Sequence, residues 1–427
     1  MSTAINNVTK FPSTRSAQPV EGRPDIELVR ADLLTPPHSP ARAFVAERLF
    51  RFVVRSLPVR VALPGGERLG AGGPDSPVMR IHRPAAFFHR LGADAKIGFG
   101  ESYMAGDWSS TAPADLLTPF AARMASLVPR PLQALRRFVD ARQPNTERNT
   151  VDGARENIHR HYDLSNDLFA AFLDETMTYS SAWFPPGGDD LAVAQRHKID
   201  GILDLAGVTA GSRVLEFGTG WGELALRAAR RGATVTSLTL SVEQRELAIR
   251  RIAEAGLSDR VTVLLRDYRE AEGRYDAVVS VEMIEAVGAE YWPTYFATLD
   301  RLLVPGGRVG LQAITMPHDR MLATRNSYTW IHKYVFPGGL CLSVPAIERT
   351  VAEHTGLRIS DRRSLGADYA RTLDHWRRRF LAAWPTISQH GFEETFRRMW
   401  EFYLAYSEAG FRGKYLDVWQ FGLTKPA

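Results

Sequence analysis

Apolar and polar positions follow two different patterns along the chain, and the change falls near residue 150. In the first part, a helical pattern at 41–55 precedes short apolar runs at 59–63, 78–82 and 96–100, with Gly-rich turns between them. Apolar runs separated by turn residues are typical of strands. The sequence therefore predicts a smaller N-terminal α+β domain over residues 25–140.

From about residue 153 the pattern alternates between short apolar runs and longer helical stretches. Short helices are expected near 153–161 and 165–173, a longer one at 191–206, and a further one that begins at the N-cap Ser241. Strands alternating with helices indicate parallel βαβ units in a doubly wound α/β sheet. The expected strands are 213–217, 234–240, 261–265, 275–281 and 307–314.

Polar segments separate these parts. Residues 1–24 are rich in Pro, Ser and Thr and are predicted to form a disordered arm. Residues 141–152 are polar throughout and are predicted to be the linker to a second domain at 153–427. Past residue 315 the alternation loosens and aromatic residues become frequent. That region is interpreted as helices and insertions that build an acceptor pocket, in which the stripe at 392–411 is either core or tunnel wall.

Composition narrows the class of protein. The chain has 427 residues, a net charge of +5 and a single cysteine, Cys341, so no disulfide framework or cysteine-based zinc site is expected. No metal site is predicted, and no apolar run reaches the roughly 20 residues of a membrane span. Arginine clusters suit an anionic surface such as phospholipid headgroups, or they simply solvate helix faces. A cytoplasmic protein at the inner face of the cytoplasmic membrane is expected.

The first expected strand of the second domain ends in a glycine-rich turn. Glu216 precedes the turn, and Gly218, Gly220 and Gly222 lie within it, before a helix. Glycines let a backbone approach a ligand, and a helix N-terminus offers free N–H groups. This spacing differs from the G-x-G-x-x-G dinucleotide fingerprint, which argues against NAD.

Two further strand ends carry polar side chains that suit a nucleoside. Thr239 and Leu240 end the second strand and Gln244 follows it, so the Thr hydroxyl and the Gln amide can replace the acidic residue that many folds use for ribose. Asp267 and Tyr268 follow the third strand, where they can accept from an adenine amino group and pack against the ring. In a doubly wound fold all of these positions meet at the carboxyl edge of the sheet.

Several ordered blocks resemble the cyclopropane-fatty-acid synthase family of methyltransferases. They include GESYMAGDW at 100–108, MTYSSAW at 177–183, SVEMIEAVG at 280–288 and GADYARTL at 366–373. The resemblance implies a Rossmann-like class I methyltransferase domain and a mono-unsaturated acyl chain of a phospholipid as substrate. It also implies S-adenosylmethionine as cofactor, bound by residues of these blocks and of the strand ends: Tyr179, Ser180, Glu216, Gly218, Gly220, Gly222, Thr239, Leu240, Gln244, Asp267 and Tyr268.

The resemblance also points to a catalytic base. In the family, bicarbonate is held by a Cys, a Glu, a His, a backbone group near an Ile, and a Tyr. The matching positions here are Ser181, Glu285, Gln312, Ile314 and Tyr369, so the Cys and the His are replaced. Ser and Gln can still hydrogen-bond an anion, but the ring that titrates near neutral pH is lost. Two readings stay open: bicarbonate still binds, or Glu285 acts more directly.

These five positions form the expected bicarbonate site, called the cradle below. The replacement of its Cys and His bears on which product forms. Alkylation of the double bond leaves a carbocation, which closes to a cyclopropane or, after a hydride shift, becomes an exocyclic methylene. Gln at the His position resembles actinobacterial methyltransferases on the route to 10-methyl (tuberculostearic-type) fatty acids. We therefore favour a 10-methylene product, with a flavin- or nicotinamide-dependent reductase as partner. Cyclopropanation and a non-catalytic lipid-binding role are the alternatives. A homo-oligomer without a nucleic-acid partner is expected.

Overall fold

The computed structural model describes residues 33, 35–124, 153 and 166–427. The predicted arm at 1–24 and the predicted linker at 141–152 lie outside the described residues, as does nearly all of the helix expected near 153–161. The helix expected at 165–173 is α8 (Asn166–Phe172).

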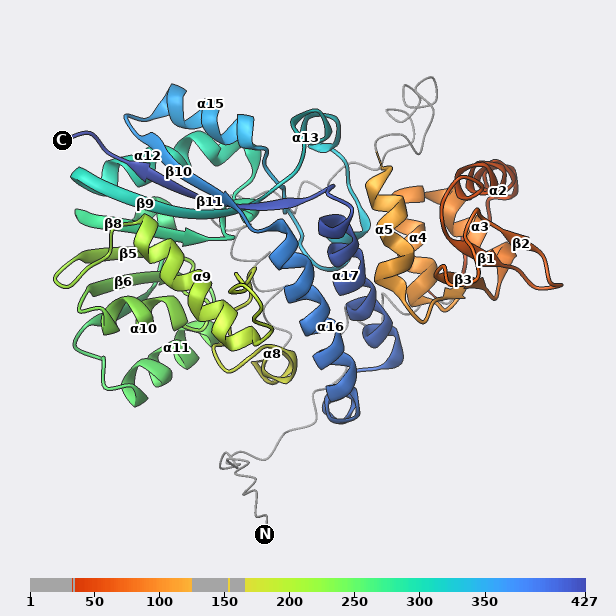
Figure 1. Ribbon diagram of the computed structural model, residues 1–427, viewed down its shortest axis with the longest axis horizontal. Coiled ribbons are helices and arrows are strands. Elements are labelled where there is room, and N and C mark those ends of the chain that lie inside the picture. Colours follow the sequence, from red (N-terminus) through yellow and green to blue (C-terminus); the bar gives the residue numbers. More distant parts are fainter. Residues whose placement is uncertain (1–32, 34, 125–152, 154–165) are drawn as a thin grey trace, which may run out of the picture.

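The described residues of the N-terminal part form four helices and a small sheet of order β2-β1-β3-β4 (Figure 1). The helix predicted at 41–55 and the strands predicted at 59–63 and 78–82 are confirmed. The elements are α2 (Pro40–Val54), β1 (Arg60–Ala62), β2 (Arg68–Leu69), β3 (Val78–Ile81), α3 (Pro84–Ala93), α4 (Ala95–Met104), β4 (Trp108–Ser109) and α5 (Pro113–Ala122).

The strand predicted at 96–100 is wrong, because this segment lies inside helix α4. The Asp94 side chain caps the helix and accepts hydrogen bonds from the backbone N–H groups of Lys96 (2.8 Å) and Ile97 (3.1 Å). A Cβ on Gly98 would lie 2.1 Å from the carbonyl oxygen of Arg90 in α3. Gly98 therefore allows two helices to pack closely.

The second part contains a seven-stranded sheet of order β10-β11-β9-β8-β5-β6-β7. The five predicted strands are confirmed, and neighbours among them pair in parallel. β11 pairs antiparallel with both β9 and β10. The strands are β5 (Arg213–Phe217), β6 (Thr234–Thr239), β7 (Val261–Leu265), β8 (Tyr275–Val281), β9 (Leu303–Thr315), β10 (Arg358–Ser364) and β11 (Asp417–Thr424).

Helices cover both faces of this sheet, which confirms the doubly wound α/β prediction. Buried residues of α9, α10 and α11 pack on one face, and those of α12 and α15 pack on the other (Figure 1). Ser241 caps α11 as predicted, since its hydroxyl accepts from the backbone N–H of Gln244. The bounds are α9 (Leu191–Leu205), α10 (Glu223–Arg230), α11 (Val242–Glu254), α12 (Trp292–Leu302), α13 (His318–Thr324), α14 (Trp330–Tyr334) and α15 (Val344–His354).

Two long helices, α16 (Gly366–Ile387) and α17 (Glu394–Arg412), stand between the sheet and the N-terminal part (Figure 1). The aromatic stripe predicted at 392–411 belongs to the core, because Trp400 and Phe402 of α17 are buried. The Phe402 ring lies 6.3 Å from that of Trp108 and 4.8 Å from that of Trp330. One continuous apolar cluster thus joins the N-terminal part to the helices beside the large sheet.

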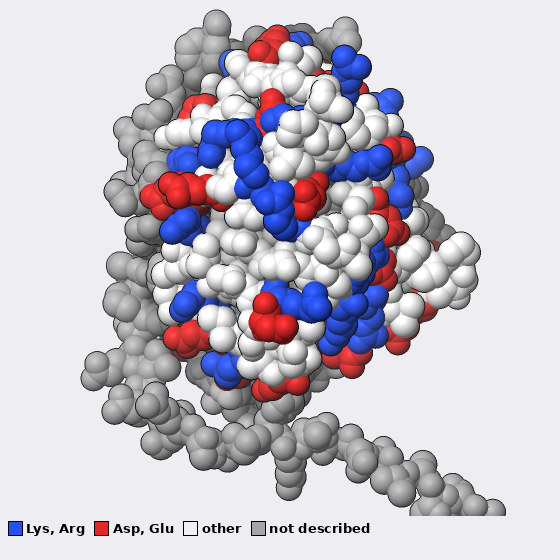
Figure 2. Space-filling view, turned by 90° about the vertical axis from the view of Figure 1, so that its left-hand side faces the viewer, with Lys and Arg blue, Asp and Glu red and all other residues white. Residues whose placement is uncertain are grey.

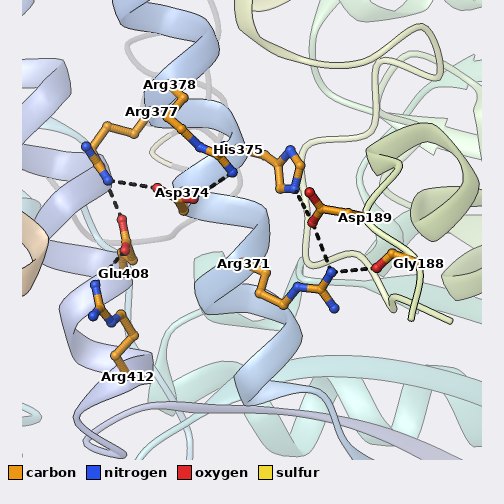
Figure 3. Close-up of polar contacts among 9 residues, drawn as sticks. All are labelled: Gly188, Asp189, Arg371, Asp374, His375, Arg377, Arg378, Glu408 and Arg412. Atoms are coloured by element: carbon orange, nitrogen blue, oxygen red, sulfur yellow. Dashed lines mark hydrogen bonds and ion pairs between the residues drawn. The ribbon is translucent and has the colours of Figure 1, made fainter. Parts of the chain in front are cut away.

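The arginines of α16 make contacts within the protein. Arg377 pairs with Asp374 (2.8 Å) and with Glu408 of α17 (3.2 Å), while Arg371 and His375 contact Asp189 (Figure 3). Basic side chains also lie beside acidic ones over most of the face shown in Figure 2. These pairs favour a role in helix packing for this arginine cluster. No helix within the described residues is long and apolar enough to cross a bilayer.

Candidate functional site

The turn after β5 opens the backbone to a cavity. Gly218 and Gly220 adopt the left-handed region, with φ of +90° and +50°. A Cβ on Gly220 would meet nothing within 4 Å, so this part of the turn faces open space. The N–H groups of Gly218 and Thr219 both donate to the carbonyl of Leu238 at 3.0 Å, which anchors the turn to β6.

The cavity lies at the carboxyl edge of the sheet, where doubly wound folds bind their ligands. Gly222 does not line it. This residue has φ +91° and caps α10, so it serves the turn between the loop and the helix. The other residues predicted for the cofactor all line the cavity: Tyr179, Ser180, Glu216, Gly218, Gly220, Thr239, Leu240, Gln244, Asp267 and Tyr268.

Several of these side chains have capacity for a nucleoside ligand. The Thr239 hydroxyl donates to the amide oxygen of Gln244 (3.1 Å), which leaves the amide N–H groups for a ligand. The Tyr268 hydroxyl is buried and has no partner among the described residues. The carboxylate of Asp267 accepts from the Arg269 guanidinium (2.8 and 2.7 Å), so a protein partner already holds it.

Two buried titratable side chains, Glu216 and Lys198, lie beside the glycine turn. Burial raises the pKa of Glu216 in β5 to about 8, although Lys198 of α9 favours its ionised form. Burial lowers the pKa of Lys198 to about 8 in turn. The Lys198 ammonium donates to the hydroxyl of Ser180 (2.6 Å), which also lines the cavity. The site therefore holds its cation away from bulk water.

A second carboxylate, Glu282, follows β8 and lines the same cavity. Its Oε1 accepts from the backbone N–H of Ser181 (2.9 Å) and from the amide of Gln312 (2.7 Å). Its Oε2 accepts from the hydroxyl of Tyr369 (2.9 Å). Gln420 of β11 donates to the amide oxygen of Gln312 (2.9 Å), which turns the Gln312 NH2 toward Glu282. Three residues predicted for the bicarbonate cradle thus surround a carboxylate of the chain itself.

The remaining two predicted cradle residues contact each other. Glu285, in the short helix η4 (Ile284–Ala286), accepts a hydrogen bond from the backbone N–H of Ile314. Its Oε2 is buried without a partner among the described residues. Burial, and then the neighbouring Glu282, raise the pKa of Glu285 to about 8. Glu285 therefore favours its protonated form at neutral pH.

Sequence reasoning assigned no role to Glu282 or Lys198. Glu282 had a usable signal, because it stands at the carboxyl end of a parallel strand, three residues before Glu285. Lys198 had no signal in the sequence that would have identified it, since a lysine in an amphipathic helix normally reaches solvent. Its position on the inner side of α9 becomes visible only when the helix is packed on the sheet.

Aromatic rings form a further wall near these carboxylates. The hydroxyls of Tyr179 and Tyr403 lie 2.8 Å apart, and the Tyr179 ring lies 5.1 Å from that of Trp376. The ring of Tyr369 lies 4.5 Å from that of Phe411. Within the described residues no three His, Cys, Asp or Glu side chains gather to hold a metal ion. The site thus combines an open glycine turn, buried titratable side chains and a neighbouring cluster of aromatic rings.

Comparison with known proteins places these features in a family. A model of the family described as mycolic acid cyclopropane synthetase matches residues 149–421. Tuberculostearic acid methyltransferase UfaA1 of Mycobacterium tuberculosis (strain H37Rv) is 54% identical over 396 residues, which cover 91% of this chain and 93% of that protein. The cyclopropane-fatty-acyl-phospholipid synthase of Escherichia coli (strain K12) is 36% identical over 351 residues, which cover 80% and 86% of the two chains.

A solved structure supports the same relationship. Mycolic acid cyclopropane synthase CmaA1, in a complex with SAH and CTAB, has a TM-score of 0.59 and 31% identity to this chain. The match covers 66% of this chain and 99% of that one.

Proposed function

Because the chain belongs to the mycolic acid cyclopropane synthetase family, we propose that it is an S-adenosylmethionine-dependent fatty acid methyltransferase. Its acceptor is the cis double bond of an unsaturated, oleoyl-type acyl chain in a phospholipid. One observation carries the proposal: a single cavity is lined both by the glycine turn and by the acidic residue Glu282. Such a cavity lets a methyl donor and a proton acceptor serve the same substrate carbon.

The residues of the cavity fit the cofactor. The open turn at Gly220 admits a ligand next to the backbone, and the amide of Gln244 is available as a donor. The hydroxyl of Tyr268 lacks a partner within the part of the chain that the structure describes. S-adenosylmethionine supplies a methyl group that its positively charged sulfur already activates. The protein therefore needs no nucleophile of its own, and its residues bind, orient and exclude water.

An alkylated double bond carries positive charge on carbon, and water would trap it as an alcohol. The buried side chains of Gln312 and Tyr369 and the aromatic wall keep this region dry. Aromatic faces also attract a cation. A carboxylate then has to take the proton that leaves the product.

We favour a 10-methylene product, the precursor of a methyl branch, over a cyclopropane. The support is the 54% identity to a tuberculostearic acid methyltransferase, against 36% to a cyclopropane synthase. A flavin- or nicotinamide-dependent reductase would then convert the methylene group into a methyl branch. A cyclopropane synthase is the alternative within the family. A non-catalytic lipid-binding protein would bind the cofactor without turnover.

The test is incubation of the purified chain with methyl-labelled S-adenosylmethionine and vesicles of dioleoyl phosphatidylglycerol. We expect label in the acyl chains and, because the two products are isomers, proton NMR of the isolated fatty ester to show a terminal methylene. Cyclopropane signals would reverse the choice of product. Retention of the cofactor with no label in lipid would establish the non-catalytic alternative.

We further propose that the protein acts at the inner face of the cytoplasmic membrane through α2. This helix exposes Phe44 (59%) and Phe52 (57%) beside the exposed arginines 42, 48 and 55. An apolar stripe flanked by arginines suits the interface of an anionic bilayer. Replacing both phenylalanines with serine should reduce co-sedimentation with phosphatidylglycerol vesicles. Unchanged vesicle binding with a lower mass in analytical ultracentrifugation would instead assign α2 to the expected homo-oligomer.

A further inference from the structure

The donors that the family would use for bicarbonate are already engaged in this protein. They come from three separate parts of the chain: the backbone of Ser181 before α9, Gln312 on β9 and Tyr369 on α16. All three converge on the carboxylate of Glu282 at 2.7–2.9 Å. Bicarbonate does not fit these residues, because it would have to displace a side chain that they already bind. On the premise of the function proposed above, we propose that the Glu282 carboxylate replaces bicarbonate as the general base.

The hydrogen bonds leave Glu282 one position for a proton. A carboxylate offers about four lone-pair sites. Ser181 and Gln312 use two of them on Oε1, and Tyr369 uses one on Oε2. The second site on Oε2 receives no hydrogen bond among the described residues. Since Glu282 lines the cavity, this oxygen can accept a proton from a ligand there.

The backbone at Glu282 indicates that its placement is costly. Its φ is +49°, in the left-handed region, where a residue with a side chain loses about 1–2 kcal/mol. The backbone N–H donates to the carbonyl of Gln312 (2.9 Å), so the strained turn is tied to β9. Strain of this kind is retained where the surrounding structure fixes it, often at functional sites. Here it directs the carboxylate toward the cavity wall.

Neighbouring charges favour an ionised Glu282. Burial raises its pKa, but Lys198 on α9 and the three donors all act in the opposite direction. Glu285 on η4 has one backbone donor and a buried oxygen without a partner among the described residues, so of the two glutamates Glu285 is the one that favours its protonated form. The pair thus carries one negative charge, opposite the ammonium of Lys198. A base in this state is ready before the methyl group is transferred.

The proton transfer needs no further reactant. A C–H bond of the transferred methyl group breaks, and its electron pair forms the exocyclic double bond after the hydride shift, or the ring bond in the alternative product. The proton bonds to Oε2 of Glu282 and gives a neutral carboxylic acid. The positive charge on carbon and the negative charge on the carboxylate are lost together. Release of that proton to water after the product leaves restores the starting state.

The first experiment compares the wild-type protein in carbon dioxide-free buffer with the same protein in added bicarbonate. We expect equal rates of lipid methylation. Glu282→Gln should lower the rate by roughly 10²- to 10⁴-fold, the usual contribution of a general base. Its affinity for SAH, measured by calorimetry, should stay close to that of the wild type. Glu254→Gln, at the exposed end of α11, is the matched control and should keep full activity.

A second variant tests the site by chemical rescue. Glu282→Gly removes the carboxylate, suits the positive φ and leaves the three donors free. We expect formate or bicarbonate to restore activity to this variant and not to Glu282→Gln. A wild-type rate that collapses without bicarbonate, or a Glu282→Gln variant that keeps most of the wild-type rate, would overturn the proposal. If the wild type labels no lipid under any condition, the proposed function itself fails, which is a separate result.

Discussion

Tyr369→Phe removes one hydrogen bond from Glu282 and keeps the ring. The hydroxyl of Tyr369 donates to Oε2 of Glu282 at 2.9 Å and favours the ionised carboxylate. The other groups that face Glu282 are Lys198 on α9, Glu285 on η4 and the uncharged Gln312 on β9. Loss of the donor therefore raises the pKa of Glu282, so the base becomes ionised only at higher pH.

The size of the effect follows from the charge on the acceptor. A hydrogen bond to a charged group contributes about 1.5–3 kcal/mol, and one pKa unit corresponds to about 1.36 kcal/mol. The acid limb of the profile of kcat against pH should therefore move upward by about one to two units. Below that limb the variant should be about 10- to 100-fold slower than the wild type. Above it, the two rates should converge.

The assay measures kcat with labelled cofactor and dioleoyl phosphatidylglycerol across the pH range, together with SAH affinity. Tyr275→Phe is the matched control, because the hydroxyl of Tyr275 donates to the carbonyl of Glu272 (3.0 Å) at the opposite end of β8. Its profile should coincide with the wild-type profile. An acid limb that stays in place or moves downward in Tyr369→Phe would refute the assignment of Glu282 as the ionised base.

Three further predictions concern stability. Gly222→Ala should destabilise the protein by about 1–2 kcal/mol in urea unfolding, because φ is +91° and the new Cβ would lie 3.1 Å from that of Ala248. Arg90→Met should cost about 3–5 kcal/mol in the same assay, since it removes a partner (3.0 Å) from the buried carboxylate of Asp107. Burial raises the pKa of Glu216 from 4.5 to about 8, so the stability it contributes is present below pH 4.5 and lost as the pH rises to about 8. The Tm of the cofactor-free protein should fall over that range, and Glu216→Gln should flatten the decline.

Each of these predictions has a control on the protein surface. Gly256→Ala places a side chain at φ +68° with no described atom within 4 Å. If Gly222→Ala loses more unfolding free energy than Gly256→Ala, the difference measures the contact with Ala248 of α11. Arg42→Met changes an exposed arginine of α2 and should leave stability unchanged. Glu254→Gln should retain the wild-type slope of Tm against pH. An equally steep slope in Glu216→Gln would show that another group binds the proton.

The sequence predicted the parts of the fold whose burial leaves an apolar pattern. Strands β5 to β9 are largely buried, so their apolar runs located them. Strand β10 has the sequence RISDRRS and lies mostly exposed at the edge of the sheet, so it gave no such signal and was missed together with β11. The run at 96–100 resembles a strand, but its glycines serve helix packing: Gly98 faces the backbone of α3 and Gly100 faces the ring of Trp330.

Most residues that line the candidate cavity were named from the sequence, but Glu282, Lys198 and the contacts among these side chains were not. The strand ends identified the cavity wall, and resemblance to the family identified the donors Ser181, Gln312 and Tyr369. What the donors bind depends on the backbone of Glu282, which adopts a conformation that its residue type disfavours. Residue patterns and propensities describe average behaviour. They cannot predict a strained residue whose partners lie more than 80 positions away along the chain, as Tyr369 (87) and Ser181 (101) do from Glu282.

The apolar cluster around Phe402 limits how this protein can be rearranged by recombination. α17 packs against α4 and α5 on one side and lies beside the catalytic half on the other. A chimera that exchanged only the first 124 residues for those of a relative would present an unmatched surface to Phe402, whose ring lies near those of Phe99, Tyr103 and Trp108. A functional exchange of the N-terminal half therefore has to include α17 from the same relative. Substitutions on the two sides of this contact are expected to have accumulated together during evolution.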